Sequence, residues 1–359
     1  MQCFGNSSAK EYEVYAPVRC GYGDVQELDE CRVGTVHLDA MTSTYVFGRS
    51  LLYVVAPIVF GLSLVGAAWQ NSEEQQTSGV ATVQAQAAEA GSPTDPKPRE
   101  RVPLPIPKDV KLPTLFLVGD STVRNGQGNG GGGQWGWGEP LVDYFNTAKI
   151  NVVNRAIGGL SSRTYMNGPG GGPWAATLAM IKEGDVVLIQ FGHNDGGQPD
   201  EPTRARSSLP GVGPETIEIE NPILKVHETV HTYGWYIRKI VQDVKAKGAT
   251  PIVCSLIPRK TWKDGKVVRS KDNFAGWARQ VAQQEHVGFL DLNEAIARRY
   301  DALGEAAVEP LFGDPHTHTS RAGAELNAEV VVSCLKAMKN DPIAGDFSAK
   351  GEAVPAYEE

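Results

Sequence analysis

Cysteine is scarce in this chain. Only 5 of the 359 residues are cysteine, and Cys3, Cys20 and Cys31 precede any segment with the composition of a folded domain. Cys254 and Cys334 fall in an apolar run and in a helical pattern. The cysteines show no metal-binding spacing, and their odd number argues against a disulfide framework. We expect Cys254 and Cys334 to be buried as small hydrophobic side chains.

Positive charge is scarce as well. Lys and Arg number 34 against 42 Asp and Glu, so the net charge is −8. Nucleic-acid-binding proteins concentrate positive charge in a patch or stripe, and we therefore expect no nucleic-acid partner. A few arginines in a cleft would still suffice to bind an anionic sugar polymer.

Phosphate-binding motifs are missing, although glycine is abundant. The two glycine-rich segments, residues 125–138 and 167–173, lack the GxGxxG and GxxxxGK[ST] patterns that hold phosphates. We interpret them as mobile loops over a site. Trp135 and Trp137, in the first loop, then either stack on sugar rings or pack in the core.

Only one long apolar run is present. Residues 51–65 carry no charge, follow an arginine and lead into a Gly-Ala-Ala exit, which is the arrangement of a secretory signal peptide. Extension over residues 50–69 would approach the roughly 20 residues of a membrane anchor, and a buried core helix is a third interpretation. We expect a secreted or periplasmic protein, with attachment to the membrane through residues 50–69 as the alternative.

This run divides the chain into regions. A methionine just before the run makes residues 1–40 a disordered extension or an artefact of start-site choice, and residues 41–69 the signal peptide or anchor. Residues 70–111 have the Gln-, Ala-, Ser-, Glu- and Pro-rich composition of a disordered linker. We expect the folded domain at 112–342 and a flexible C-terminal tail at 343–359.

From residue 112, apolar runs alternate with amphipathic helical patterns, such as the one at 231–248 and a last helix after Ser320. Unbroken Val, Ile and Leu runs indicate strands covered on both faces, as in a parallel sheet. The alternation predicts a three-layer, doubly wound α/β fold. The strand-like runs lie at residues 114–119, 150–159, 185–195, 249–258 and 287–292.

Polar residues and glycines stand where three of these strands end, and another polar group precedes the last helix. Along the chain they are Gly119-Asp120-Ser121, Gly158-Gly159, His193-Asn194-Asp195 and the segment from Asp314 to His318. Doubly wound folds bring the carboxyl ends of their strands to one rim, so we expect these groups to converge there.

Their chemistry is that of a serine hydrolase. A serine needs a base, for which histidine is suited, and the base needs an orienting carboxylate such as Asp314. At a strand-to-helix turn, the N–H of Ser121 would lie near a helix start and favour an oxyanion. A glycine N–H and the Asn194 amide would complete an oxyanion hole.

The same segments resemble a known family. FLVGDSTV, NRAIGGLSSRTY, QFGHNDGG and the C-terminal Asp/His block resemble the four blocks of the SGNH (GDSL-like) hydrolases. The flanking HETVHTYGWYIRK is similar to the rhamnogalacturonan acetylesterase group, and the resemblance extends over residues 114–338. It implies a flavodoxin-like α/β/α sandwich with a five-stranded parallel sheet. It also implies Ser121 as nucleophile, with oxyanion donors from the N–H groups of Ser121 and Gly159 and from the Asn194 side chain.

The spacing of the C-terminal block departs from the superfamily, which places the aspartate three residues before the histidine. Here Pro315 occupies that position and Asp314 stands one residue earlier. We expect His318 to be the base, because HTS before the helix matches the family best, with its Nε2 about 3 Å from Ser121 Oγ. His316, which we expect to serve the loop or the substrate, is the alternative base.

Other roles stay open for several residues. His316 and His318, beside Asp314, fit a zinc site if His193 or Asp195 supplies a third strong ligand. His193 fits equally a hydrogen-bonding role within its loop. Asp120 fits a cap or a tie of the turn. Arg163, after Gly159, either binds a uronate carboxylate or is structural.

We expect a secreted carbohydrate O-acetylesterase that uses Ser121, His318 and Asp314 without a metal or organic cofactor. Its substrate would be an acetylated polysaccharide, and by resemblance acetylated rhamnogalacturonan or pectin. The alternatives are an esterase for lipid, aryl or other acyl esters, and a non-catalytic glycan-binding module on the same fold.

Overall fold

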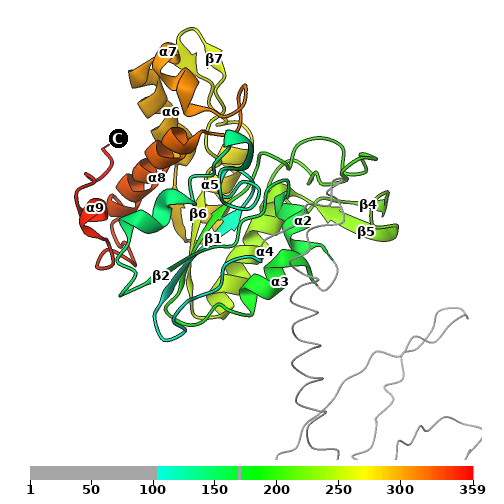
Figure 1. Ribbon diagram of the computed structural model, residues 1–359. Coiled ribbons are helices and arrows are strands. Elements are labelled where there is room, and N and C mark those ends of the chain that lie inside the picture. The colour runs from blue at the N-terminus through cyan, green and yellow to red at the C-terminus, as the bar shows by residue number, and fades with distance from the viewer. Residues whose placement is uncertain (1–102, 169–170, 359) are drawn as a thin grey trace, which may run out of the picture. The chain divides into compact units, whose positions relative to one another are not determined.

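A five-stranded, all-parallel sheet forms the centre of the computed structural model, which describes residues 103–168 and 171–358 (Figure 1). Its strands are β1 (Thr114–Gly119), β2 (Asn151–Asn154), β3 (Val186–Gln190), β6 (Thr250–Cys254) and β9 (Gly288–Leu290). The spatial order is β2–β1–β3–β6–β9, and every neighbouring pair is parallel. This is the strand order of flavodoxin-like folds. The predicted fold class and all five predicted strands are confirmed.

Helices cover both faces of this sheet (Figure 1). One face carries α2 (Ser162–Met166), α3 (Gly172–Leu178), α4 (Tyr233–Ala246) and α5 (Phe274–Gln284). The opposite face carries η2 (Pro140–Tyr144), α6 (Leu292–Leu303) and α8 (Arg321–Lys336). Peripheral elements are η1 (Gly131–Gly133), α7 (Glu305–Val308), η4 (Glu309–Leu311) and α9 (Ala349–Glu352).

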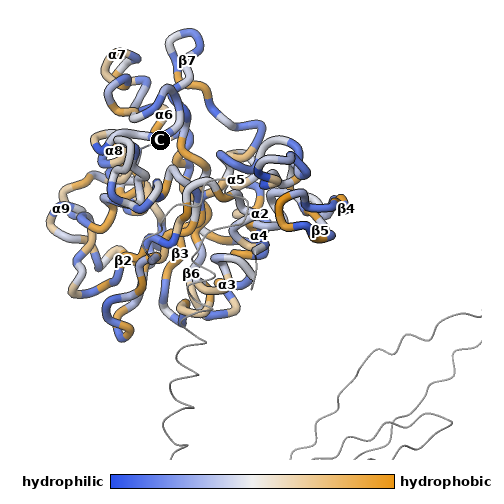
Figure 2. The backbone as a smooth tube through the Cα atoms, turned by 45° about the vertical axis from the view of Figure 1, so that its right-hand side comes forward, coloured by the Kyte–Doolittle hydropathy of each residue, from blue (hydrophilic) through white to orange (hydrophobic). Residues whose placement is uncertain are grey.

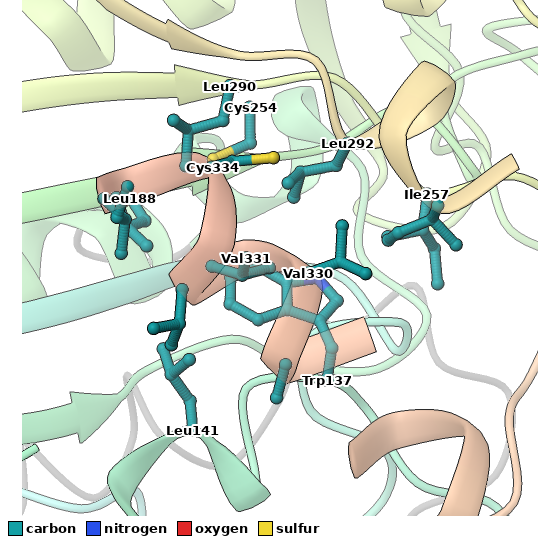
Figure 3. Packing of buried hydrophobic residues seen from close by; sticks show 14 of the residues in the cluster. Trp137, Leu141, Leu188, Cys254, Ile257, Leu290, Leu292, Val330, Val331 and Cys334 are labelled. Atoms are coloured by element: carbon teal, nitrogen blue, oxygen red, sulfur yellow. The ribbon is translucent and has the colours of Figure 1, made fainter. Parts of the chain in front are cut away.

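Each central strand feeds two separate cores because its side chains alternate between the faces of the sheet. In β1, Leu115 and Leu117 enter the core beneath α6 and α8, whereas Phe116 and Val118 enter the core beneath α2 to α5. The first of these cores includes Cys254 and Cys334, both buried and unpaired, as expected (Figure 3). Burial raises the pKa of both thiols.

The helix signals in the sequence correspond to the observed ends. α4 begins after Thr232, whose side chain accepts a hydrogen bond from the N–H of Trp235, and the chain leaves the helix through Gly248 at a φ of 72°. α8 begins after Ser320, which caps the N–H of Gly323. Among the described residues, none of the helices has the length and apolar composition of a membrane span.

Two antiparallel hairpins, which the sequence patterns did not indicate, interrupt the alternation. They are β4 (Thr216–Asn221) with β5 (Val226–His231), and β7 (Trp262–Lys263) with β8 (Lys266–Val267). The first projects from the α2 side of the sandwich (Figures 1 and 2). Its strands carry mostly exposed polar side chains, so they lack the apolar runs that identified the central sheet.

The packed region extends beyond both expected domain boundaries. Leu104, only 6% exposed, belongs to the core beneath α2 to α5, although it falls in the segment 70–111 expected to be a disordered linker. Ile343, Phe347 and Val354 are buried in the other core, so the flexible tail expected at 343–359 is wrong for its described residues. A few well-placed apolar side chains anchor both polar segments. The expected extension, signal or anchor, and the linker up to residue 102 lie outside the described residues.

Leu104→Ala should therefore destabilise the domain, and Ile106→Ala should not. Leu104 is buried, whereas Ile106 is 63% exposed, so these neighbours form a matched pair. We expect the first substitution to lower the free energy of unfolding by about 2–3 kcal/mol and the second by less than about 0.5 kcal/mol. Urea unfolding of the two variants measures the difference, and equal midpoints would show that the segment does not contribute to the core.

Candidate active site

Ser121 lies two residues after the end of β1 and is buried, with 7% of its surface exposed. The chain turns sharply there, because the N–H groups of Val123 and Arg124 both donate to the carbonyl of Asp120 at 3.1 Å. Gly119 permits this path, since a Cβ at that position would lie 2.4 Å from the carbonyl oxygen of Gln190. The turn holds Ser121 at the carboxyl edge of the sheet, where ligands bind in such folds.

The helix expected directly after Ser121 is absent from this stretch, which forms a turn at 121–124 followed by the glycine-rich segment. Repeated glycines disfavour helix propagation. The N–H of Ser121 is therefore not at a helix terminus, and any oxyanion stabilisation there comes from the peptide group itself.

Ser121, His318 and Asp314 form a continuous hydrogen-bonded chain. The Oγ of Ser121 lies 2.8 Å from Nε2 of His318, and Nδ1 of the same ring lies 2.5 Å from Oδ2 of Asp314. The side chains of His318 and Asp314 are 23% and 18% exposed, so the chain of bonds lies at the surface. This is the geometry of an activated nucleophile with an oriented base. Both ring nitrogens of His318 have partners, which argues against the zinc alternative.

The carboxylate of Asp314 organises the loop that carries the histidine. Its Oδ1 accepts hydrogen bonds from the N–H groups of His316, Thr317 and His318, at 3.0, 2.6 and 3.1 Å. Burial alone would raise the pKa of Asp314, but these donors and the His318 ring outweigh it and lower the pKa to about 2. Asp314 is therefore ionised at neutral pH.

This wrapping explains the irregular spacing of the block. The segment 313–318 is bent around the carboxylate rather than extended, so a residue four positions before His318 reaches its Nδ1. His316 lies apart: it is exposed, and its Nδ1 pairs with Oγ1 of Thr317 at 2.5 Å. The structure brings His318, and not His316, to Ser121.

Gly158 and Gly159 lie next to the nucleophile. A Cβ on Gly158 would sit 3.3 Å from Cβ of Ser121, and Gly159 adopts a φ of 88°, which disfavours any residue with a side chain. Within residues 103–168 and 171–358, no hydrogen bond uses the N–H of Ser121 or of Gly159. Both remain available to a substrate oxygen.

Asn194 is 8% exposed and follows β3. Its Nδ2 donates to the carbonyl of Leu160 at 2.8 Å, which ties it to the loop after Gly159. A side-chain amide has two N–H donors. The bond to Leu160 uses one and orients the group, which leaves the second for the site.

Two buried aspartates, Asp195 and Asp120, accept hydrogen bonds from the loops that carry the site residues. Asp195 accepts hydrogen bonds from the N–H and hydroxyl of Ser162 and from the hydroxyl of Ser208. Burial raises the pKa of Asp195 to about 7, against the effect of the Ser162 bonds. Asp120 ties the turn by accepting from the N–H and hydroxyl of Thr122, as the tie interpretation expects.

His193 does not fix its loop through ring hydrogen bonds. Its Nδ1 lies 3.4 Å from Oδ2 of Asp120, without hydrogen-bond geometry, and its Nε2 also lacks a partner among the described residues. The contact still matters electrostatically. Burial raises the pKa of Asp120, but the nearby His193 ring and the Thr122 bonds outweigh it and hold that pKa below its usual range.

Arg163 is not placed to bind a substrate. Its side chain is 0% exposed, ion-paired with Glu228 at 2.6 Å, and donates to the carbonyls of Pro199 and Ser207. The guanidinium makes four hydrogen bonds inside the protein and is not exposed, so the expected uronate role is wrong. The sequence could not reveal this, since Glu228 belongs to the unforeseen β4–β5 hairpin.

The two tryptophans of the first glycine-rich segment differ. Trp137 is buried and donates from Nε1 to Gln190 at 2.8 Å, so it packs in the core (Figure 3). Trp135 is half-buried, lies under the Arg321 guanidinium at 4.9 Å, and pairs through its backbone with Thr319. The segment thus reaches the His318 loop, as expected for a loop next to the site. Trp135 as a sugar-stacking surface stays a prediction.

Residues 204–206 were not identified from the sequence. They contact the segment 158–161 that carries Gly159, which we call the oxyanion loop. Nη1 of Arg206 donates to the carbonyl of Gly159 at 2.8 Å, and the hydroxyl of Ser161 donates to the carbonyl of Arg206 at 2.5 Å. The arginines in the stretch TRAR were a visible signal, but nothing in the sequence placed them beside Gly159.

Comparisons with known proteins agree on one family. The model of the GDSL-like lipase/acylhydrolase family matches residues 117–326. A rhamnogalacturonan acetylesterase of Emericella nidulans is 32% identical over 223 residues, which cover 62% of this chain and 84% of the relative. The probable rhamnogalacturonan acetylesterase YesY of Bacillus subtilis is 27% identical over 227 residues, covering 62% of this chain and 92% of the relative.

A solved structure shows the same architecture. The crystal structure of YxiM from Bacillus subtilis superposes with a TM-score of 0.50 at 25% identity. The match covers 68% of this chain and 59% of YxiM, so it spans less than two thirds of that protein.

Proposed function

Since the chain belongs to the GDSL-like lipase/acylhydrolase family, we propose that it is a carbohydrate O-acetylesterase that acts on acetylated rhamnogalacturonan. The observation that carries the proposal is the Ser121–His318–Asp314 chain of hydrogen bonds beside two free backbone donors. The names of the relatives from Emericella nidulans and Bacillus subtilis support the substrate.

In the first half-reaction, Nε2 of His318 removes the proton of Ser121 as Oγ attacks the acetyl carbonyl carbon. The ionised Asp314 holds the Nδ1–H and stabilises the imidazolium that forms. The tetrahedral oxyanion is held by the N–H of Ser121, the N–H of Gly159 and the free N–H of Asn194. His318 then protonates the sugar oxygen, the C–O bond breaks, and acetyl-Ser121 remains.

In the second half-reaction, water replaces the sugar. His318 removes one proton from the water as its oxygen attacks the acetyl carbonyl, and the same oxyanion donors hold the intermediate. His318 returns the proton to Ser121 Oγ when acetate leaves. Every proton transfer uses the one ring nitrogen that lies 2.8 Å from Ser121.

Acetate release from a panel of esters tests this function. Wild-type protein and Ser121→Ala are incubated with acetylated rhamnogalacturonan, acetylated xylan and 4-nitrophenyl palmitate. We expect wild-type to release acetate most rapidly from the first and Ser121→Ala to release almost none. Preference for the palmitate ester would favour the lipid-esterase alternative, and no hydrolysis of any ester would favour a glycan-binding module.

For localisation, we propose that residues 41–69 direct the protein to secretion or hold it at the membrane. The support is the uncharged run at 51–65 with its Gly-Ala-Ala exit in the sequence. Fractionation of the producing cells checks this, and recovery of the full chain in the cytosol alone would contradict it.

A further inference from the structure

The segment containing Arg204 and Arg206 is fastened to the oxyanion loop. Arg206 donates to the carbonyl of Gly159, and Ser161 donates to the carbonyl of Arg206. Between the arginines, Ala205 is fully buried and adopts a φ of 44°, a left-handed conformation that is unfavourable for a residue with a side chain. The segment is therefore held in one defined shape.

Arg204 faces the open side of Gly159. Apart from the adjacent residues, the one described atom within 4 Å of a Cβ placed on Gly159 would be Nη2 of Arg204, at 3.8 Å. Gly158, one residue earlier, contacts Ser121. The Arg204 guanidinium therefore lies beside Gly159, and the preceding residue, Gly158, lies beside the nucleophile.

The Glu201 carboxylate lies close enough to Arg204 for a charge interaction, but no direct ion pair joins these two groups. Across residues 103–168 and 171–358, no carboxylate forms an ion pair with the Arg204 guanidinium, and the nearby Glu201 carboxylate accepts instead from Thr203 and from the backbone N–H of Arg204. Arg206 adds a second positive charge. Burial and the like charge of Arg204 lower the pKa of Arg206 to about 10, so it too is charged at neutral pH.

Among the described residues, neither Arg204 nor Arg206 forms an ion pair with a carboxylate, although Asp120, Asp195 and Glu201 act on Arg206 from a distance. Two partly buried guanidinium groups close together and without a direct ion pair favour an anionic ligand. Arginine presents a planar fork that matches a carboxylate, and such charge-assisted bonds are stronger than neutral ones. Arg163 is held in an ion pair with Glu228. Arg204, unlike Arg163, therefore has donors available for a ligand.

We propose that Arg204, positioned beside Arg206, binds a carboxylate of the substrate next to the scissile acetyl ester, so that the site selects acetylated glycans containing uronic acid residues. This rests on the proposed acetylesterase function. The Arg204 guanidinium lies beside Gly159. When the acetyl oxygen of a substrate accepts a hydrogen bond from the Gly159 N–H, this guanidinium would be within reach of the sugar. The interaction is made with the sugar rather than the reacting atoms, so its loss should raise KM more than it lowers kcat.

The test compares an acetylated, uronate-containing oligosaccharide with the same oligosaccharide after methyl esterification of its carboxylates. We expect wild-type kcat/KM to be about 10- to 100-fold higher for the acidic form. Arg204→Met should bring that ratio near 1, mainly through KM. Arg204→Lys, which keeps the charge but not the fork, should restore part of the ratio.

Arg298→Met is the matched control, because Arg298 lies on α6 with its side chain 50% exposed and pairs with Glu294. It should keep the wild-type ratio. Equal wild-type rates for the two oligosaccharides, or a ratio that survives in Arg204→Met, would overturn the inference while acetate release upheld the proposed function. If wild-type hydrolysed 4-nitrophenyl acetate but released no acetate from either oligosaccharide, the proposed function would fail, and the inference with it.

Discussion

His318→Ala is expected to lower kcat by about 10⁶-fold, as much as Ser121→Ala, because the two groups act as a unit. Without the imidazole, nothing removes the Ser121 proton, and the 2.8 Å contact to Nε2 is lost. Asp314→Asn should cost less, on the order of 10⁴, since the base stays in place but loses its ionised partner. Steady-state kinetics with 4-nitrophenyl acetate measure all three variants.

His316→Ala provides the matched control, because the two histidines lie two residues apart in one loop. The His316 ring is exposed and pairs with Thr317 rather than Ser121. We expect it to retain kcat within a few-fold of wild-type on this small ester. An inactive His316→Ala together with an active His318→Ala would reverse the assignment of the base.

Asn194→Ala is expected to lower kcat by roughly 10²–10³ with only a modest change in KM, as for the loss of one oxyanion donor. One N–H of Asn194 is held by the carbonyl of Leu160, so the other points to a fixed place. The developing charge meets that donor only in the transition state, which explains why binding of the ground state should change little.

Asn194→Asp separates this effect from a structural one. It keeps the size of the side chain but replaces the donor by a negative acceptor, so it should be slower than Asn194→Ala. Thermal unfolding of both variants reports any loss from the Leu160 bond. An Asn194→Ala variant with wild-type kcat would remove Asn194 from the mechanism.

The central sheet could be predicted because its strands leave an unambiguous signal. Residues 186–189, for example, are an unbroken run of Val, Leu and Ile, which is typical of a strand covered on both faces. The structure buries every position of this strand. Once the order of strands and helices is known, the rim of the sheet follows, and with it the convergence of Ser121, Gly159 and Asn194.

What the sequence did not reveal depends on contacts between distant residues. The sequence places Arg163 near the rim, after Gly159. In the structure it pairs with Glu228 of the β4–β5 hairpin, which lies 65 positions away in the sequence. Arg206 reaches Gly159 across 47 positions. The polar C-terminal segment looks like a tail, yet Phe347 packs against Phe145 with ring centroids 5.2 Å apart. No local pattern encodes these pairings.

The Asp314 loop lies between these cases. Its residues were identified, and the choice between His316 and His318 was the open question. The answer comes from the carboxylate, whose three backbone bonds bend the segment and so set which ring faces the serine. Spacing alone does not contain that geometry.

Covalent labelling with a fluorophosphonate tests most directly the central claim that His318 and Asp314 activate Ser121 as a nucleophile. The probe reacts with an activated serine, and mass spectrometry of the digested protein locates the adduct. We expect one adduct per chain, on Ser121, which disappears in Ser121→Ala and forms far more slowly in His318→Ala. Absence of an adduct in wild-type protein, or an adduct that persists in Ser121→Ala, would contradict this claim.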